Sequence, residues 1–289
     1  MGLLTVDQID FGPTDARHII FARPEDSGLF RKVFLKPSNV DTAKYLDGRK
    51  SIIYGIKGAG KSAWLKHLEM SLASDAISRF VYFRKETDRF FDENHIIPTN
   101  SIEVANTETI TKTQTRVFWR ALIALILADI LRGSSDKWAQ SFCTYVAEAI
   151  RGEVSWLKQM VSRVPLLKEF VARAGSDGAQ LELKGEFAAK KLHEATDIEL
   201  FSIVGKIASF QPVYIFFDEM EISFTSSTRH QAELLFISSL VEAIRDLNEI
   251  FRKQNVKIFL IAAIRKEIAN NISGGDISKI INDLGQEII

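Results

Sequence analysis

One glycine-rich segment combines a lysine and a hydroxyl in a spacing suited to holding a phosphate chain. Gly55–Ser62 reads GIKGAGKS and fits G-x-x-x-x-G-K-[ST] at every fixed position. Glycines let the backbone wrap closely around phosphate oxygens, with N–H groups pointing inward. In such a loop Lys61 reaches the β- and γ-phosphates, and the Ser62 hydroxyl ligates Mg²⁺. The residues expected to contact the nucleotide are Gly55, Lys57, Gly58, Ala59, Gly60, Lys61, Ser62 and Ala63. The alternative is a glycine turn that binds nothing.

Two adjacent carboxylates, Asp218 and Glu219, follow the strongest strand-like run of the chain, Val213–Phe217. Open α/β sheets bind their ligands at the carboxyl ends of the strands. We expect this strand to lie beside the strand of the phosphate loop, so that Asp218 holds Mg²⁺. Glu219 is then the general base that polarises the attacking water, and Glu221 is a spare candidate. The alternative is a strand end with ordinary solvated acids.

Short apolar runs and helical spacings alternate around these two motifs. Strands are expected at residues 51–54, 80–83, 213–217 and 257–262. Helices are expected at residues 40–46, 61–73, 116–131, 136–151, 154–173, 193–208, 229–253 and 265–272. Ser38 or Asn39 is the expected cap of the first helix, and Ser134 and Ser135 are the expected caps of the fourth. Strands alternating with helices predict an α/β fold with a mainly parallel sheet covered on both faces.

The same pattern divides the chain into parts. Residues 1–48 are expected to form an irregular arm and a short helix, and residues 49–289 the nucleotide-binding core. Residues 85–210 are expected to form a mostly helical insert between the second strand and the acidic strand, with one small strand at Gln180–Lys184. The helix at 229–253 has an apolar stripe, and its charged residues are expected to face away from the core. Those residues are Glu242, Arg245, Asp246, Glu249 and Lys253.

Composition gives no support for several classes of partner and site, although a local basic patch for nucleic acid remains possible. Lysine plus arginine total 37 and aspartate plus glutamate total 37, so net charge gives no support for binding nucleic acid. The histidines have no metal-ligand spacing, and the one cysteine, Cys143, is expected to be a buried apolar residue rather than a nucleophile. Met1–Asp10 lacks the features of a signal peptide, and no apolar run is long enough to span a bilayer. We therefore expect a cytoplasmic protein without a membrane partner.

The phosphate loop, the acidic strand and the helices between them resemble the additional-strand, catalytic-glutamate division of P-loop ATPases. Within that division the chain resembles AAA-related and STAND-like prokaryotic ATPases. The segment Asp41–Gly55 is similar to an uncharacterised bacterial P-loop ATPase group whose members are often associated with phage defence. The resemblance implies Mg²⁺-dependent ATP binding, a sheet order of 5-1-4-3-2 and a catalytic glutamate on an inserted central strand.

The resemblance also implies a polar sensor residue after the acidic strand, at the end of the following strand. Arg265 stands near that position, where Asn or Thr is usual. Three roles remain open for it: contact with the γ-phosphate, sensing of a neighbouring subunit's nucleotide, or capping of a surface helix. Arg229 and Arg252 are weaker candidates for an arginine that reaches a neighbour. Relatives carry a fifth strand and then a helical lid; here the last residues are Gln286–Ile289, so we expect the lid to be missing.

The expected function is ATP hydrolysis coupled to a conformational change, with Glu219, Lys61 and Arg265 as the catalytic residues. A protein partner or self-association is expected, in a prokaryotic defence or signalling system. Adenine is favoured because no Asn-Lys-x-Asp segment is present to read guanine, and no residue that reads the base is identified. One alternative is a switch protein that binds ATP with negligible turnover. A third reading, a small-molecule kinase, would need an arginine-rich acceptor lid that the sequence does not display.

Overall fold

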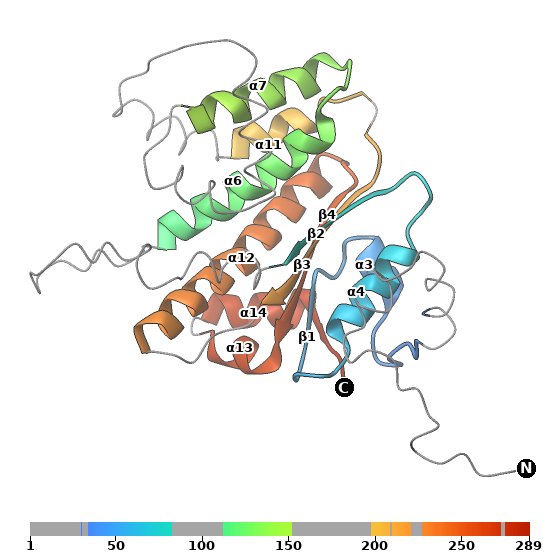
Figure 1. Ribbon diagram of the computed structural model, residues 1–289, viewed down its shortest axis with the longest axis vertical. Helices are drawn as coiled ribbons and strands as arrows, with labels where there is room; N and C mark the ends of the chain where they lie inside the picture. Colours follow the sequence, from blue (N-terminus) through green and yellow to red (C-terminus); the bar gives the residue numbers. More distant parts are fainter. Residues whose placement is uncertain are drawn as a thin grey trace, which may run out of the picture.

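The computed structural model describes residue 30 and residues 34–82, 112–151, 198–208, 210–220, 227–272 and 275–289. Within these residues, five parallel strands form one sheet that helices cover on both faces (Figure 1). The strands are β1 (Ile52–Gly55), β2 (Ile77–Tyr82), β3 (Val213–Met220), β4 (Ile258–Arg265) and β5 (Gly285–Glu287). The helices are α3 (Thr42–Leu46), α4 (Lys61–Met70), α6 (Lys112–Leu131), α7 (Lys137–Arg151), α11 (Ile198–Val204), α12 (Ser227–Lys253), α13 (Lys266–Asn271) and α14 (Gly275–Leu284). The expected α/β class is confirmed.

The strand order is β2-β3-β4-β1-β5. Counted from the β5 edge, the same order is 5-1-4-3-2, the numbering that the resemblance implied. One expectation was wrong: the acidic strand β3 does not lie beside β1. β4 lies between them, and it pairs with β3 on one side and with β1 on the other. The central strand of the sheet is therefore β4, whereas the acidic pair lies on β3.

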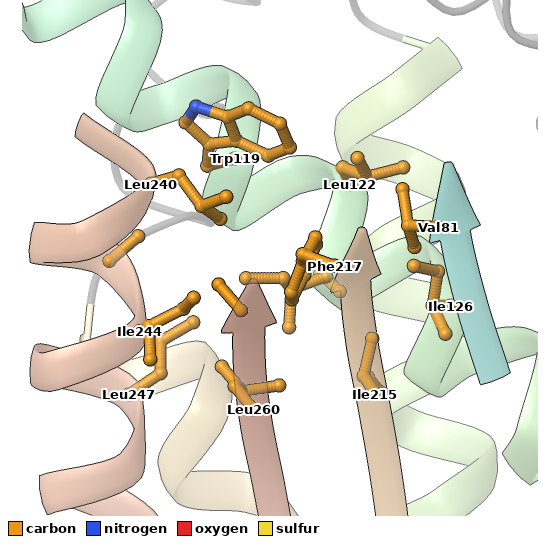
Figure 2. Close-up of a cluster of buried hydrophobic side chains, with 14 of the residues drawn as sticks. Val81, Trp119, Leu122, Ile126, Ile215, Phe217, Leu240, Ile244, Leu247 and Leu260 are labelled. Atoms are coloured by element: carbon orange, nitrogen blue, oxygen red, sulfur yellow. The ribbon is translucent and has the colours of Figure 1, made fainter. Parts of the chain in front are cut away.

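The two faces of the sheet are buried against different helices, which explains why the central strands are apolar at nearly every position. In β3, Val213, Ile215 and Phe217 point to one face, and Tyr214 and Phe216 point to the other. The first face packs against α6, α7, α11, α12, α13 and α14, and Figure 2 shows part of this cluster. The second face packs against α3 and α4.

The described helices of the expected insert share the core of the sheet. Buried residues of α6, α7 and α11 belong to the same cluster as β3 and β4, and α6 lies along α12 (Figure 1). Leu122 and Ile126 of α6 point toward Val81 of β2 and toward Phe217 in Figure 2. The helix expected at 154–173 and the strand expected at 180–184 lie outside the described residues, as does the arm before residue 30.

Several local expectations need correction. The cap of α3 is Asp41, whose carboxylate accepts from the N–H of Ala43, and not Ser38 or Asn39. The cap before α7 is Asp136, which accepts from the N–H groups of Trp138 and Ala139, and not Ser134 or Ser135. A carboxylate can accept from two N–H groups at a helix start, so it competes well with a hydroxyl nearby.

The expectation that all charged residues of α12 face away from the core was wrong for part of them. Glu242 is only 5% exposed and, with Asp246, it faces cations of α6. Arg245 is half-buried and pairs with Asp246. The periodic apolar stripe of α12 packs against the sheet, but α6 covers the flank that the periodicity assigned to solvent. Lys253 is exposed, Glu249 is partly exposed, and their side chains pair with each other.

No helix in the described parts of the chain combines the length and the apolar character needed to cross a bilayer.

Candidate active site

The phosphate-loop motif connects the end of β1 to the start of α4. Gly58 and Gly60 adopt φ values of +86° and +83°, a left-handed conformation that disfavours any side chain. A Cβ at either position would meet no atom within 4 Å. These glycines therefore provide a backbone conformation and leave open space beside the loop, which is what a phosphate chain needs.

Gly55 is required for a different reason. A Cβ there would lie 2.7 Å from the carbonyl oxygen of Ile288, because β5 runs directly alongside the end of β1. The N–H of Ile288 donates to the carbonyl of Tyr54 at 2.7 Å. The start of the loop is thus fixed by residues far away in the chain, which the motif alone does not indicate.

The first turn of α4 faces the loop. Gly60 is the N-cap, and its carbonyl accepts from the N–H of Trp64 at 2.8 Å. The N–H groups at the start of a helix have no intrahelical partner, and they carry the positive end of the helix dipole. The start of α4 is therefore suited to an anion held by the loop.

Lys61 places its ammonium group over the loop. Its Nζ atom donates to the carbonyl of Gly55 at 3.0 Å and to that of Ile56 at 2.8 Å. The positive charge is thus held against the first two residues of the loop. A lysine in this place can neutralise the outer phosphates of a nucleotide.

The two motifs meet through a side-chain hydrogen bond. The Ser62 hydroxyl donates to Oδ1 of Asp218 at 3.1 Å, although the residues are 156 positions apart. Asp218 is 3% exposed and ends the regular part of β3. A hydroxyl and a carboxylate oxygen are hard ligands, and Mg²⁺ prefers one or two of these together with waters and phosphate oxygens. Among the described residues no group of three or more His, Cys, Asp or Glu side chains could hold a metal ion.

β3 changes register at the acidic pair. Phe217 lies opposite Ala262 and Met220 lies opposite Ile264, so β3 uses three steps where β4 uses two. Such a bulge bends a strand and re-aims its side chains, and bulges are common next to active sites. The backbone of Glu219 lies within this bulge; its side chain lies outside the described part. Asp218 remains in register with Tyr82 of β2.

Arg265 reaches the same edge of the sheet as the loop. It ends β4, directly opposite Gly55 in the register of β1 and β4. It is also the N-cap residue of α13, but its side chain makes no capping hydrogen bond. Arg265 therefore occupies the capping position through its backbone, and the two roles toward a phosphate group stay open beside it. The adjacent Lys266 forms an ion pair with Glu287 of β5 at 2.5 Å.

The remaining candidates are not brought to the loop. Arg252 lines a pocket of about 150 Å³ with Lys257 and Ile258, at the start of β4 and hence at the opposite edge of the sheet. Glu221 lies outside the described residues, and so does the side chain of Arg229. Cys143 is half-buried and donates to the carbonyl of Ala128. Burial raises the pKa of its thiol, which agrees with an unreactive role.

Sequence reasoning missed the residues that hold these elements in place. Asn39 donates to the carbonyl of Glu287 at 2.5 Å, and the side chain of Gln286 accepts from the N–H of Asp41. Trp119 of α6 contacts Phe217, next to Asp218. These contacts join segments distant in sequence, so no local pattern signals them.

Compared with models of protein families, with curated proteins and with solved structures, the chain shows no match.

Proposed function

We propose that the chain is a P-loop ATPase that binds Mg-ATP at Gly55–Ser62 and hydrolyses it beside Asp218 and Glu219. One observation carries the proposal: the Ser62 hydroxyl and the Asp218 carboxylate meet at 3.1 Å at the start of α4. A nucleotide held by the loop would then have an anion-binding helix start, an ammonium group and an acidic strand end around its outer phosphates.

Each residue has a definite role in this proposal. The N–H groups of the loop and of the first turn of α4 bind the phosphates, and Lys61 offsets their charge. Ser62 and Asp218 hold Mg²⁺, which when bound draws charge away from the β- and γ-phosphates. Glu219 orients a water for attack on the γ-phosphorus and accepts its proton. Arg265 lies beside the loop and stabilises the charge on the transferring phosphoryl group, in its own subunit or in a neighbour's.

The arrangement of the sheet supports the same assignment. The loop follows the second strand from the β5 edge, and β4 separates it from the acidic strand. This is the arrangement implied by the additional-strand division of P-loop ATPases. The carboxyl ends of β1, β3 and β4 bring the loop, Asp218 and Arg265 to one edge, where open parallel sheets bind ligands. We also propose that the protein is located in the cytoplasm, has a protein partner and acts in a defence or signalling system.

Nucleotide binding tests the loop directly. Lys61→Ala should weaken the binding of Mg-ATP at least about tenfold, since it removes a charge-assisted contact worth roughly 1.5–3 kcal/mol. Lys279→Ala is the matched control, because Lys279 is an exposed lysine on α14. Equal affinity of both variants for Mg-ATP would overturn the proposal. Competition by GTP measures the expected preference for adenine.

Phosphate release tests hydrolysis. The parent chain should release phosphate from ATP without any added acceptor, which a small-molecule kinase would not do. Glu219→Gln should abolish this release and keep the affinity for Mg-ATP, because the amide cannot accept the proton of the attacking water. A parent chain that binds Mg-ATP but releases no phosphate would support the switch protein instead.

A further inference from the structure

Trp119 of α6 lies against the strand that carries the acidic pair. It is 1% exposed. Its ring meets the ring of Phe217 edge to face, at 5.9 Å between centroids and 88° between planes. Figure 2 shows Trp119 beside Leu240 of α12, with Phe217 beneath it on β3. A residue of the helical insert thus supports the position directly before Asp218.

The indole orientation is fixed by a hydrogen bond. Nε1 of Trp119 donates to the carbonyl of Phe236 in α12 at 2.8 Å, and the rings of these residues also meet edge to face at 6.2 Å. Trp64 on the other face of the sheet is equally buried, but its Nε1 has no partner among the described residues. A buried indole whose N–H has a hydrogen-bond partner is held in one orientation. Apolar packing without this bond would restrict the Trp119 ring less strictly.

Polar contacts also set the register of α6 on α12. Thr115 and Ser239 join their hydroxyls at 2.6 Å in the interior. About two turns further along α12, Arg116 and Arg120 both approach Asp246, at 3.3 Å and 3.5 Å. Apolar packing tolerates small slides of one helix along another, but buried polar groups lose their partners when the register changes. These contacts therefore hold Trp119 at one height above β3.

Phe217 needs this support because of its place in the strand. It is fully buried, and the bulge begins immediately after it. At a bulge the ladder of backbone hydrogen bonds is disrupted, so side-chain packing has more influence on where the following residues lie. The phosphate loop is fixed separately, through β5 and through the helices on the opposite face. Asp218 is held by its hydrogen bond to Ser62 and by its register with Tyr82 of β2.

We propose that Trp119 is a positioning residue for the reaction: through Phe217 it fixes the bulge of β3 in which Glu219 lies. This inference rests on the proposed ATPase function. It separates two properties of the site, because the loop and Asp218, which bind Mg-ATP, have contacts of their own, whereas Glu219 lies in the bulge. Loss of the Trp119 contact should lower turnover while leaving nucleotide affinity nearly unchanged.

The test compares Trp119→Phe and Trp119→Leu with Phe142→Leu, a control in the same apolar cluster but on α7. Steady-state phosphate release gives kcat, equilibrium titration with Mg-ATP gives Kd, and thermal unfolding gives Tm for each variant. Loss of the hydrogen bond, worth about 1 kcal/mol, should lower kcat about fivefold in Trp119→Phe, and Trp119→Leu should lose more. Kd should change less than about twofold, and Phe142→Leu should keep kcat despite its lower Tm.

A double-mutant cycle keeps the proposal testable if Trp119→Leu does not fold. Trp119→Phe, Phe217→Leu and the double variant should have non-additive effects on kcat, because both changes act on one contact. Additive effects, or a kcat loss in Phe142→Leu equal to that in Trp119→Phe, would overturn the positioning role alone. A parent chain without phosphate release would instead overturn the ATPase proposal, and this inference with it.

Discussion

Replacing Gly60 by alanine separates two roles of this residue in the phosphate loop, its left-handed backbone conformation and its contact with bound phosphate. Gly60 has φ +83°, and Gly133 after α6 has φ +84°; a Cβ at either would meet nothing within 4 Å. The two substitutions therefore carry the same conformational cost, roughly 1–2 kcal/mol for a side chain in the left-handed region. For a chain of this size that corresponds to a fall in Tm of about 2–8 °C in both variants.

Nucleotide binding should distinguish them. The Cβ of Gly60→Ala would enter the open space beside the loop, where we place the phosphates, and it would keep a phosphate oxygen from the backbone N–H groups. Loss of one charge-assisted hydrogen bond, roughly 1.5–3 kcal/mol, weakens binding about 10- to 150-fold. Gly133→Ala should bind Mg-ATP as the parent does, because Gly133 lies in the turn between α6 and α7.

The assay is a calorimetric titration with Mg-ATP. It is run roughly 15–20 °C below the lower of the two Tm values, so that both variants stay folded. Equal Tm shifts with a selective loss of affinity in Gly60→Ala would support the site. Parent-like affinity in Gly60→Ala would refute the reasoning, since no phosphate could then lie against the Gly60 backbone.

Three further predictions concern single side chains. Ser62→Ala should weaken nucleotide binding about tenfold with Mg²⁺ present and leave it unchanged in EDTA, because only the metal loses a ligand; the same loss in EDTA would contradict this. Asn248→Ala should lower the free energy of unfolding by about 2–4 kcal/mol in a urea titration. The side-chain amide of Asn248 forms two hydrogen bonds of 2.9 Å, one with the N–H and one with the carbonyl of Leu260. Hydrogen bonds from the Ala208 N–H and then from other backbone N–H groups lower the pKa of Asp136 from its ordinary value of 3.8. The stabilisation that Asp136 gives the folded state is therefore present above about pH 4 and is lost as the pH falls through its folded-state pKa. Asp136→Asn should therefore flatten the acid side of the stability profile, and an unchanged profile would count against this carboxylate.

Local patterns predicted the central elements well. β3 was expected at 213–217 because its residues are apolar or β-branched and end at two acids, and it extends to Met220 through the bulge. The helices at 116–131 and 136–151 correspond to α6 and α7 within a few residues. Strong periodicity and length identify such elements because burial on one face or both leaves a clear signature.

Contacts between distant segments were not predictable in the same way. The expected solvent face of α12 includes Glu242, which α6 covers, and periodicity cannot tell which helix will cover which flank. The misplacement of β3 beside β1 has the same origin, since order within a sheet is a property of the whole chain. For the candidate site, the motif predicted the meeting of Ser62 and Asp218 but gave no sign of Trp119 or Ile288.

The contact between Gly55 and β5 has a consequence for folding during synthesis. The phosphate loop leaves the ribosome early, but its first residue packs against Ile288, and Asn39 bonds to a residue 248 positions later. At the usual rate of synthesis, about 10 to 50 s separate the appearance of these partners. Until then the β1 edge stays unpaired on one side, and nascent chains should acquire nucleotide affinity only after β5 emerges.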